Sequence, residues 1–358
     1  MKKLGSDCNS NSKSIIKNWI AFFAFFYYYI GPISVVGYLL SLLKTRWVLP
    51  IKDWSILLFL LPMFLYSCYS SGFLDSILLY RLHWGFLIFY LYFRNKAHLF
   101  NFKQLLFLML LMTLIESALV NTIVDASSLP NYPDLESAAT HFSNIWQRAY
   151  SFGGNSSVTG VLIIAVLSIV GGGLLLMITA LITVLLVGSG SGIIAYFIYL
   201  FYKIKIIKKI VFFLLFGLFW LFLVNDIDAL YKISPYYIDL LIDLKQVQIS
   251  STLDNMDEIT MFVGSSKLSD TGGDFLWLSF FAVHGYIGII LMLFIIFTHI
   301  NRANIFGIGI IFLLTSHYFI LFSLPGQLIA GYLFALKPFN HVQLNLKLKQ
   351  INNYRRVK

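Results

Sequence analysis

Residues 275–298 read FLWLSFFAVHGYIGIILMLFIIFT. The stretch contains no Asp, Glu, Lys or Arg, and it is longer than the roughly 20 residues that an α-helix needs to cross a bilayer. It also lacks the period-2 alternation of a barrel strand. Because lipid offers no partners to backbone N–H and C=O groups, the stretch is predicted to form a transmembrane helix.

The rest of the chain has the same character. Of its 358 residues, 59% are hydrophobic and 12% are charged, whereas a soluble domain carries about 25% charged residues. The mean hydropathy is +0.80. Hydrophobic runs occupy residues 18–43, 54–70, 74–93, 104–120, 157–171, 174–187, 190–202, 210–225, 274–298, 304–323 and 325–336. They predict an all-α, polytopic helical membrane protein, with residues 1–358 forming a single integral membrane domain of about 11–12 transmembrane segments.

Basic clusters orient these segments, because Lys and Arg are enriched in cytoplasmic loops. Clusters lie at 203–209, at 94–103, at Arg302 and in a basic tail at 337–358. If these four are cytoplasmic, two long loops, about 121–156 and about 226–273, lie on the opposite, external face. Most of the 16 acidic residues fall in those loops or at their edges.

The first hydrophobic run poses a parity problem. Lysines precede it at positions 2, 3, 13 and 17, and basic residues also follow it at 44, 46 and 52. A hairpin turning at Gly31-Pro32 would place both groups in the cytoplasm, because Pro interrupts a helix and Gly permits a reversal. This predicts about 12 segments with both termini inside; 11 segments with the N-terminus outside is the alternative. No small-residue cleavage signature follows, so a retained anchor is expected.

Charge and motifs exclude several function classes. The formal charge of +10 is explained by the positive-inside pattern, so no nucleic acid partner is expected. The two cysteines, Cys8 and Cys68, have no metal or disulfide spacing. A Walker motif, a Rossmann glycine pattern, HExxH and Gly-x-Ser-x-Gly are all missing from the sequence. Soluble nucleotide chemistry and zinc proteolysis are therefore not expected.

The second long loop contains an amphipathic segment. Apolar residues recur over 236–245, with Asp239 and Asp243 four positions apart on one face. The spacing predicts a helix that lies along the membrane surface.

Arg148 opens the first stretch that could carry chemistry, WQRAYSFGGNSSVTG at 146–160. An Arg at a membrane boundary is commonly a snorkelling anchor. Here, however, Gly154 and Asn155 belong to a Gly-Gly-Asn-Ser-Ser run directly before a predicted helix N-terminus. Free amides and the helix dipole at such a place suit an anion, and Arg binds phosphate oxygens bidentately. Both interpretations stay open.

Arg81 lies inside the run 74–93, with His83 two residues later. An ionisable residue within the membrane is costly and is a candidate for a functional site. The alternative is a structural ion pair within the membrane, for which Glu116 is the obvious partner.

A third constellation ends the second loop, FVGSSKLSDTGGDFLW at 262–277. Asp270 and Asp274 flank two glycines, so both carboxylates could reach a cleft at the water–lipid boundary and serve as a general base. Asp274 also suits the N-cap of the following helix. His284 is expected to be a packed, hydrogen-bonded residue, and His141 in the first loop is a weaker acid–base candidate.

With these residues the chain resembles the bacterial O-antigen and capsular polysaccharide polymerases, the Wzy family, which share a fold with the O-antigen ligases. The first motif is carried by Arg148 with Gly153, Gly154, Asn155 and Gly160. The second is carried by Gly264, Asp270, Asp274, Leu276, Gly285 and Gly288. The likeness in layout covers nearly the whole chain, and the motifs cover about 40 residues of it. One departure is that the segment 188–192 has no Arg, where family members often have a Ser-Arg pair.

The resemblance implies a multi-pass protein of the bacterial inner membrane that transfers glycosyl groups on the periplasmic face. An undecaprenyl-diphosphate-linked polymer would be moved onto another lipid-linked repeat unit, as in lipopolysaccharide or capsule synthesis. Arg148 and Arg81 would neutralise the diphosphate, without a metal or cofactor, and Asp274 or Asp270 would be the base. Gly154, Asn155, Lys267 and His141 would contribute to substrate binding. A chain-length regulator is a possible protein partner.

Three rival functions stay open. A flippase or transporter of lipid-linked oligosaccharides would need broken helices at the bilayer midplane and often carries paired repeats. No repeat is visible in the sequence, and a transporter would not need the two large external loops. An O-antigen ligase usually carries a His where this chain has Asp274. A non-catalytic membrane scaffold would not explain why an arginine, Arg81, lies within an apolar run.

Overall fold

The computed structural model describes residues 19–45, 50–94, 101–124, 148–203, 235–267, 276–314 and 320–336. Within these ranges the chain is helical and forms no β-strand, which confirms the predicted all-α fold class. Among the described residues, three helices are long and apolar enough to cross a membrane, and counting each of two bent helix pairs as one span brings the number of candidate spans to five. The described residues do not test the prediction of 11–12 segments, because that prediction covers the whole chain. The predicted run 210–225, for example, lies outside the described residues.

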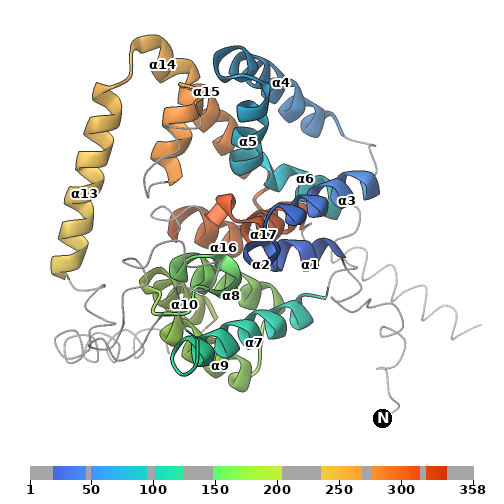
Figure 1. Ribbon diagram of the computed structural model, residues 1–358, viewed down its shortest axis with the longest axis vertical. Coiled ribbons are helices and arrows are strands. Elements are labelled where there is room, and N and C mark those ends of the chain that lie inside the picture. Colours follow the sequence, from blue (N-terminus) through green and yellow to red (C-terminus); the bar gives the residue numbers. More distant parts are fainter. Residues whose placement is uncertain are drawn as a thin grey trace, which may run out of the picture.

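The helices follow the predicted hydrophobic runs closely (Figure 1). They are α1 (Trp19–Phe25), α2 (Tyr27–Ile30), η2 (Gly31–Val35), α3 (Val36–Lys44), α4 (Ile51–Ser71), α5 (Phe73–Trp84), α6 (Phe86–Phe93), α7 (Phe102–Val120), η5 (Ser151–Gly153), α8 (Ser156–Val170), α9 (Leu174–Val187), α10 (Gly190–Lys203), α13 (Pro235–Asp254), α14 (Glu258–Val263), α15 (Leu276–His299), α16 (Ile305–Gly309), η7 (Ile310–Leu314), η8 (Ile320–Phe322) and α17 (Leu324–Ala335).

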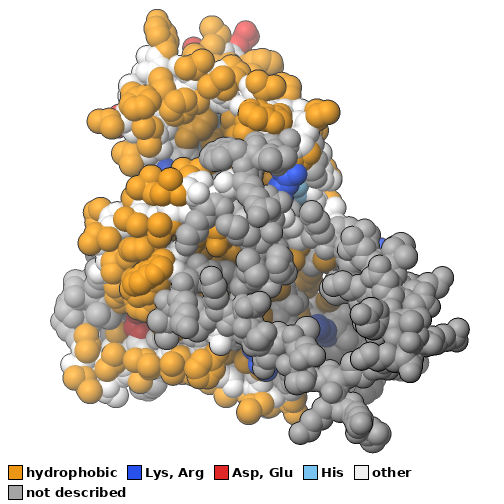
Figure 2. Space-filling view, turned by 90° about the vertical axis from the view of Figure 1, so that its right-hand side faces the viewer, with side chains coloured by type: hydrophobic (Ala, Val, Ile, Leu, Met, Phe, Trp, Pro, Cys, Tyr) orange, Lys and Arg blue, Asp and Glu red, His pale blue; other side chains and the backbone are white. Residues whose placement is uncertain are grey.

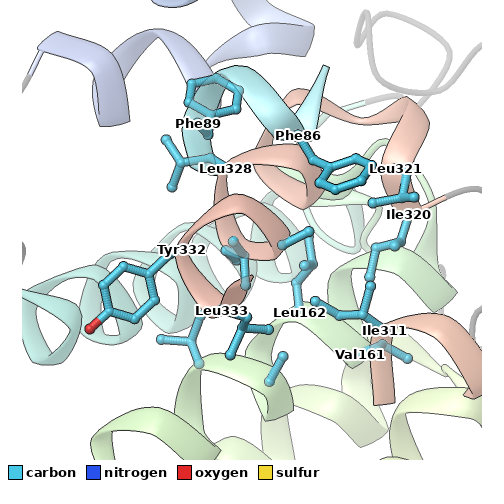
Figure 3. Packing of buried hydrophobic residues seen from close by; sticks show 14 of the residues in the cluster. Phe86, Phe89, Val161, Leu162, Ile311, Ile320, Leu321, Leu328, Tyr332 and Leu333 are labelled. Atoms are coloured by element: carbon cyan, nitrogen blue, oxygen red, sulfur yellow. The ribbon is translucent and has the colours of Figure 1, made fainter. Parts of the chain in front are cut away.

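Helix α17 is the centre of the packing. All of its residues are buried, and it lies against α6 on one side and α8 on the other (Figure 3). Phe86 and Phe89 of α6 and Leu162 of α8 point towards it. Inside a bilayer, such helix association depends on close van der Waals contact, because lipid is as apolar as the side chains.

The outward side of α4 and α5 is apolar. Figure 2 shows hydrophobic side chains over most of the described part of one face, with few charged ones. Large side chains that are more than half exposed on these two helices are Ile51, Leu58, Phe59, Leu61, Leu65, Tyr69, Phe73 and Leu74. A contiguous apolar surface of this kind suits contact with lipid.

The first hydrophobic run is broken, but not where the sequence predicts. The axis turns by 79° between α1 and the helix that follows, at Phe26. Gly31-Pro32 instead begins the 3-10 turn η2, because Pro is tolerated in the first turn of a helix, where its missing N–H is not needed. Helix α1 nevertheless packs against α3, so the run folds back on itself.

The helix predicted at 236–245 is confirmed as part of α13, which continues to Asp254. Asp239 and Asp243 are both exposed. Helix α13 runs along one side of the molecule and leads into the short helix α14, which packs on α15 (Figure 1).

Candidate functional site

Arg81 stands in the last turn of α5, just before a break in the helix. The axis bends by 58° between α5 and α6 at Gly85, and such a break frees carbonyl groups that need new partners. The Arg81 carbonyl oxygen keeps a helical hydrogen bond from the Gly85 N–H, at 3.2 Å. The buried side-chain amide of Gln327 donates to it as well, at 2.7 Å, and to the Leu82 carbonyl oxygen, at 3.2 Å. Its own oxygen accepts a hydrogen bond from the Tyr38 hydroxyl. The break is therefore a supported feature of the fold.

The Arg81 side chain lines a groove of about 410 Å³ between α3, α4, α5 and α6. Apart from Arg81, the groove is lined by aliphatic and aromatic residues and one glycine: Val35, Tyr38, Leu42, Leu57, Leu60, Phe64, Ile77, Tyr80, Trp84, Gly85, Leu87, Ile88 and Leu91. Asp53 pairs with Arg94, and Nε2 of His299 lies 3.7 Å from the Asp53 carboxylate. Among the described residues, Arg81 has no anionic partner.

The alternative in which Arg81 pairs with Glu116 is not what the structure has. The Glu116 carboxylate accepts a hydrogen bond from the Tyr29 hydroxyl and another, at 2.6 Å, from the backbone N–H of Ser151. Glu116 therefore anchors the segment that precedes α8, rather than neutralising α5. The sequence suggested the pair only because both residues lie within apolar runs, and it contained no information on which helices are neighbours.

Two buried histidines lie behind the groove. The ring centroids of His83 and His284 are 4.9 Å apart, and the indole N–H of Trp84 donates to Nε2 of His284 at 3.2 Å. His284 is thus the packed, hydrogen-bonded residue that was predicted. His83 is fully buried between aromatic rings, including that of Phe280.

The stretch after Arg148 differs from the expected open anion site. The side chain of Asn155 caps α8 by accepting from the Ser157 N–H at 2.8 Å. The N–H of Gly153 donates to the Thr159 hydroxyl, and the N–H of Gly154 donates within the preceding turn. These amides therefore have acceptors inside the protein. Arg148 itself is half-buried at the start of the stretch.

The two ends of the second motif meet in space. Gly285 interrupts α15 with non-helical angles (φ 61°, ψ −163°), and the segment that contains Gly264 lies across this kink. A methyl group on Gly264 would lie 2.1 Å from the carbonyl oxygen of Val283, and one on Gly285 would lie 2.5 Å from that of Phe262. Both glycines have positive φ, so both the close approach and the conformation require glycine.

Hydrogen bonds fix this crossing. The N–H groups of Ser265 and Ser266 donate to the carbonyl oxygens of Ala282 and Val283, at 2.9 and 3.0 Å. On the other side, the Ser71 hydroxyl at the end of α4 donates to the Ser266 carbonyl at 2.6 Å. The segment is thereby fixed between α4 and α15.

A polar pocket of about 580 Å³ opens beside the crossing. It is lined from α4, α13, α14, the segment after α14 and α15. The lining residues are Tyr66, Ser70, Ser251, Thr252, Asn255, Met256, Thr260, Gly264, Ser265, Lys267, Leu278, Ser279 and Ala282. The volume is within the range of small-molecule sites. Next to the pocket, hydrogen bonds from Thr260 hold the pKa of the Asp257 carboxyl below its usual value.

The predicted site residues therefore fall in three places. Lys267 lines the polar pocket, Arg81 lines the apolar groove, and Arg148 lines neither. Helix α4 borders both cavities. Asp270, Asp274 and His141 lie outside the described residues.

Sequence reasoning missed a buried polar network at the other end of α4. Asp53, which is 2% exposed, pairs with Arg94 and accepts from the Tyr90 hydroxyl at 3.0 Å. That hydroxyl also lies 3.0 Å from Nε2 of His299. The only sequence signal was one acidic residue directly after the basic residues at 44, 46 and 52, in the first turn of α4. His299 had none.

In the described ranges no group of three or more His, Cys, Asp or Glu side chains is placed to share a metal ion. In comparisons with known proteins, no family model, curated protein or solved structure matches this chain. The groove and the pocket therefore carry the functional argument on their own chemistry.

Proposed function

We propose that this protein is a membrane glycosyltransferase that polymerises undecaprenyl-diphosphate-linked oligosaccharide repeat units at the periplasmic face of the bacterial inner membrane. One observation carries the proposal. Arg81 lines an otherwise apolar groove and has no ion pair with any described residue. Within the ranges named above, the groove thus combines aliphatic walls with one cation.

This combination suits an amphiphilic anion. A cation in an apolar environment is costly unless an opposite charge offsets it, and a guanidinium can bind two phosphate oxygens at once. The apolar walls suit a hydrocarbon chain, and the exposed apolar side chains of α4 and α5 suit entry from the bilayer. A polyprenyl diphosphate has both parts.

In the proposed reaction, a hydroxyl oxygen of the acceptor sugar attacks the anomeric carbon of the donor, and the bond from that carbon to the diphosphate oxygen breaks. Undecaprenyl diphosphate leaves with the electron pair, while the hydroxyl proton passes to a carboxylate, Asp270 or Asp274. Arg81 and Arg148 are proposed to offset the charge that develops on the diphosphate. The polar pocket beside Lys267 is proposed to hold sugar.

Complementation of a polymerase-null bacterial strain tests the proposal. The gene is expressed in strains that carry different repeat-unit pathways, and the polysaccharide is resolved on a gel. A ladder of long chains supports polymerisation. The proposal fails if the protein is present in the membrane and only single repeat units appear in every strain.

A second candidate is a flippase or transporter of lipid-linked oligosaccharides. It is favoured by the breaks at Gly85 and Gly285, since transporters build their binding sites from interrupted helices. Rescue of a flippase-null strain, without rescue of the polymerase-null strain, would favour it. An O-antigen ligase, the third alternative, would restore the joining of finished polymer to lipid A core in a ligase-null strain.

A further inference from the structure

Three hydroxyl groups on the α13 and α14 side of the polar pocket are already committed as donors. Those of Ser251 and Thr252 donate to the Gln248 carbonyl, at 3.1 and 2.8 Å. The Thr260 hydroxyl hydrogen-bonds to the Asp257 carboxylate. A hydroxyl has one proton and two lone pairs, so these oxygens can only accept a further hydrogen bond.

The Asn255 side chain adds a further acceptor to the pocket. It uses one of its two N–H groups to donate to the Ser251 carbonyl at 2.7 Å, which leaves its carbonyl oxygen and one N–H for a ligand. Because acceptors predominate on the wall formed by α13 and α14, that wall matches a ligand with many O–H donors. Saccharides are such ligands, whereas a bare phosphate would bring only acceptors.

Lys267 adds a single charge to this wall. It is the one charged residue among those that line the pocket in the described part of the chain, and it forms no ion pair there. Its backbone is held, because its N–H donates to the Ser265 hydroxyl at 3.3 Å and the two preceding residues are bound to α15. The ammonium group therefore extends from a fixed base.

The acidic residues nearby do not cancel this charge within the pocket. Asp254, Asp257 and Glu258 belong to the same region but are not lining residues. The Asp257 carboxylate is already occupied, because it caps α14 by accepting from the Thr260 N–H at 2.7 Å. Among the described lining residues, the charge presented to a ligand is therefore positive.

We infer that the polar pocket is a binding subsite for an acidic sugar, in which the hydroxyl and amide oxygens accept from the sugar hydroxyls and Lys267 pairs with a carboxylate on the sugar. The inference rests on the proposed function and extends it, because it names uronic-acid-like residues as part of the repeat unit that is recognised.

Binding of defined disaccharides to the full-length protein in nanodiscs tests the inference by saturation-transfer NMR. The probes are a glucuronic-acid-containing disaccharide and its neutral glucose counterpart. The acidic disaccharide should bind about tenfold tighter or more, as a charge-assisted hydrogen bond implies. The variant Lys267→Gln should lose this preference, and Lys267→Arg should keep it. Lys267 is exposed, so both variants should unfold at the wild-type temperature.

Three outcomes would overturn the inference. They are equal binding of the two disaccharides, no binding of either, and a preference that survives in Lys267→Gln. Displacement of the acidic disaccharide by inorganic diphosphate at equal concentration would also contradict it, since Lys267 would then serve the leaving group. The readout needs no polymerisation. Binding without complementation would refute the polymerase proposal alone, and complementation without acid preference would refute the subsite alone.

Discussion

The side-chain amide of Gln327 donates a hydrogen bond of 2.7 Å to the carbonyl oxygen of Arg81, 246 positions away in the sequence. The contact joins α17, the central buried helix, to the last turn of α5, where the chain bends at Gly85. The position of the arginine in the apolar groove thus depends on a polar group from the middle of the fold.

Replacing Gln327 with Leu should destabilise the protein by about 3 kcal/mol, because the Leu82 carbonyl would lose its side-chain donor and the buried Tyr38 hydroxyl would lose its acceptor. The Arg81 carbonyl would keep only the Gly85 N–H. A lower midpoint of thermal unfolding in detergent would show this. The same substitution at Gln104, which is exposed on α7, is the matched control and should change the midpoint little. Equal midpoints for the two variants would contradict the role given to Gln327.

Gly264→Ala should be strongly destabilising. The new methyl group would meet the Val283 carbonyl oxygen at 2.1 Å, at a residue whose φ is +84°, so a cost of about 2 kcal/mol or more is expected. Gly173→Ala is the control, since nothing lies within 4 Å of a methyl group there and no positive φ is involved. If both variants unfold alike, the crossing of 264–266 over α15 is not required for stability.

Arg81→Ala should remove long polysaccharide from a complemented polymerase-null strain, with a loss of about 100-fold or more, as expected for the loss of a charge that stabilises a leaving group. Arg81→Lys should retain part of the product. The backbone carbonyl that Gln327 binds is unchanged in both, so the break in the helix is preserved.

Arg148→Ala is also predicted to abolish long chains. Normal ladders from either alanine variant would remove that arginine from the proposed site.

The predicted orientation can be checked with single cysteines in a chain in which Cys8 and Cys68 are replaced by Ala. A cysteine at Gln246, on the exposed part of α13, should react with an impermeant maleimide in intact spheroplasts. A cysteine at Arg302 should react only after lysis. Reaction of Arg302→Cys, with protection of Gln246→Cys, would invert the topology.

Local pattern was enough to predict most of the helices. The runs 174–187 and 190–202 match α9 and α10 to within a residue, because an unbroken apolar run that is bounded by glycines or by lysines has one low-energy conformation in lipid. The spacing of Asp239 and Asp243 likewise predicted α13. Breaks were harder to place: Gly31-Pro32 looked like the turn, yet the axis bends at Phe26.

The candidate site was less predictable, because it depends on contacts between distant segments. Arg81 was identified because burying a charge within an apolar run costs free energy. The acidic residue that the sequence offered as its partner, Glu116, is hydrogen-bonded to Tyr29 and Ser151 and not to Arg81. The sequence gives no reason to single out Ser251, Thr252 and Asn255, since polar residues are common in a loop region. They line a pocket because the segment after α14 crosses α15 next to them.

The most direct measurement of the central claim uses the purified protein in liposomes with an undecaprenyl-diphosphate-linked repeat unit as the only substrate. The account predicts lipid-linked oligomers of increasing length, with one undecaprenyl diphosphate released for each new glycosidic bond, and neither product from Arg81→Ala. Repeat units that cross the bilayer unchanged, with no undecaprenyl diphosphate released, would contradict it.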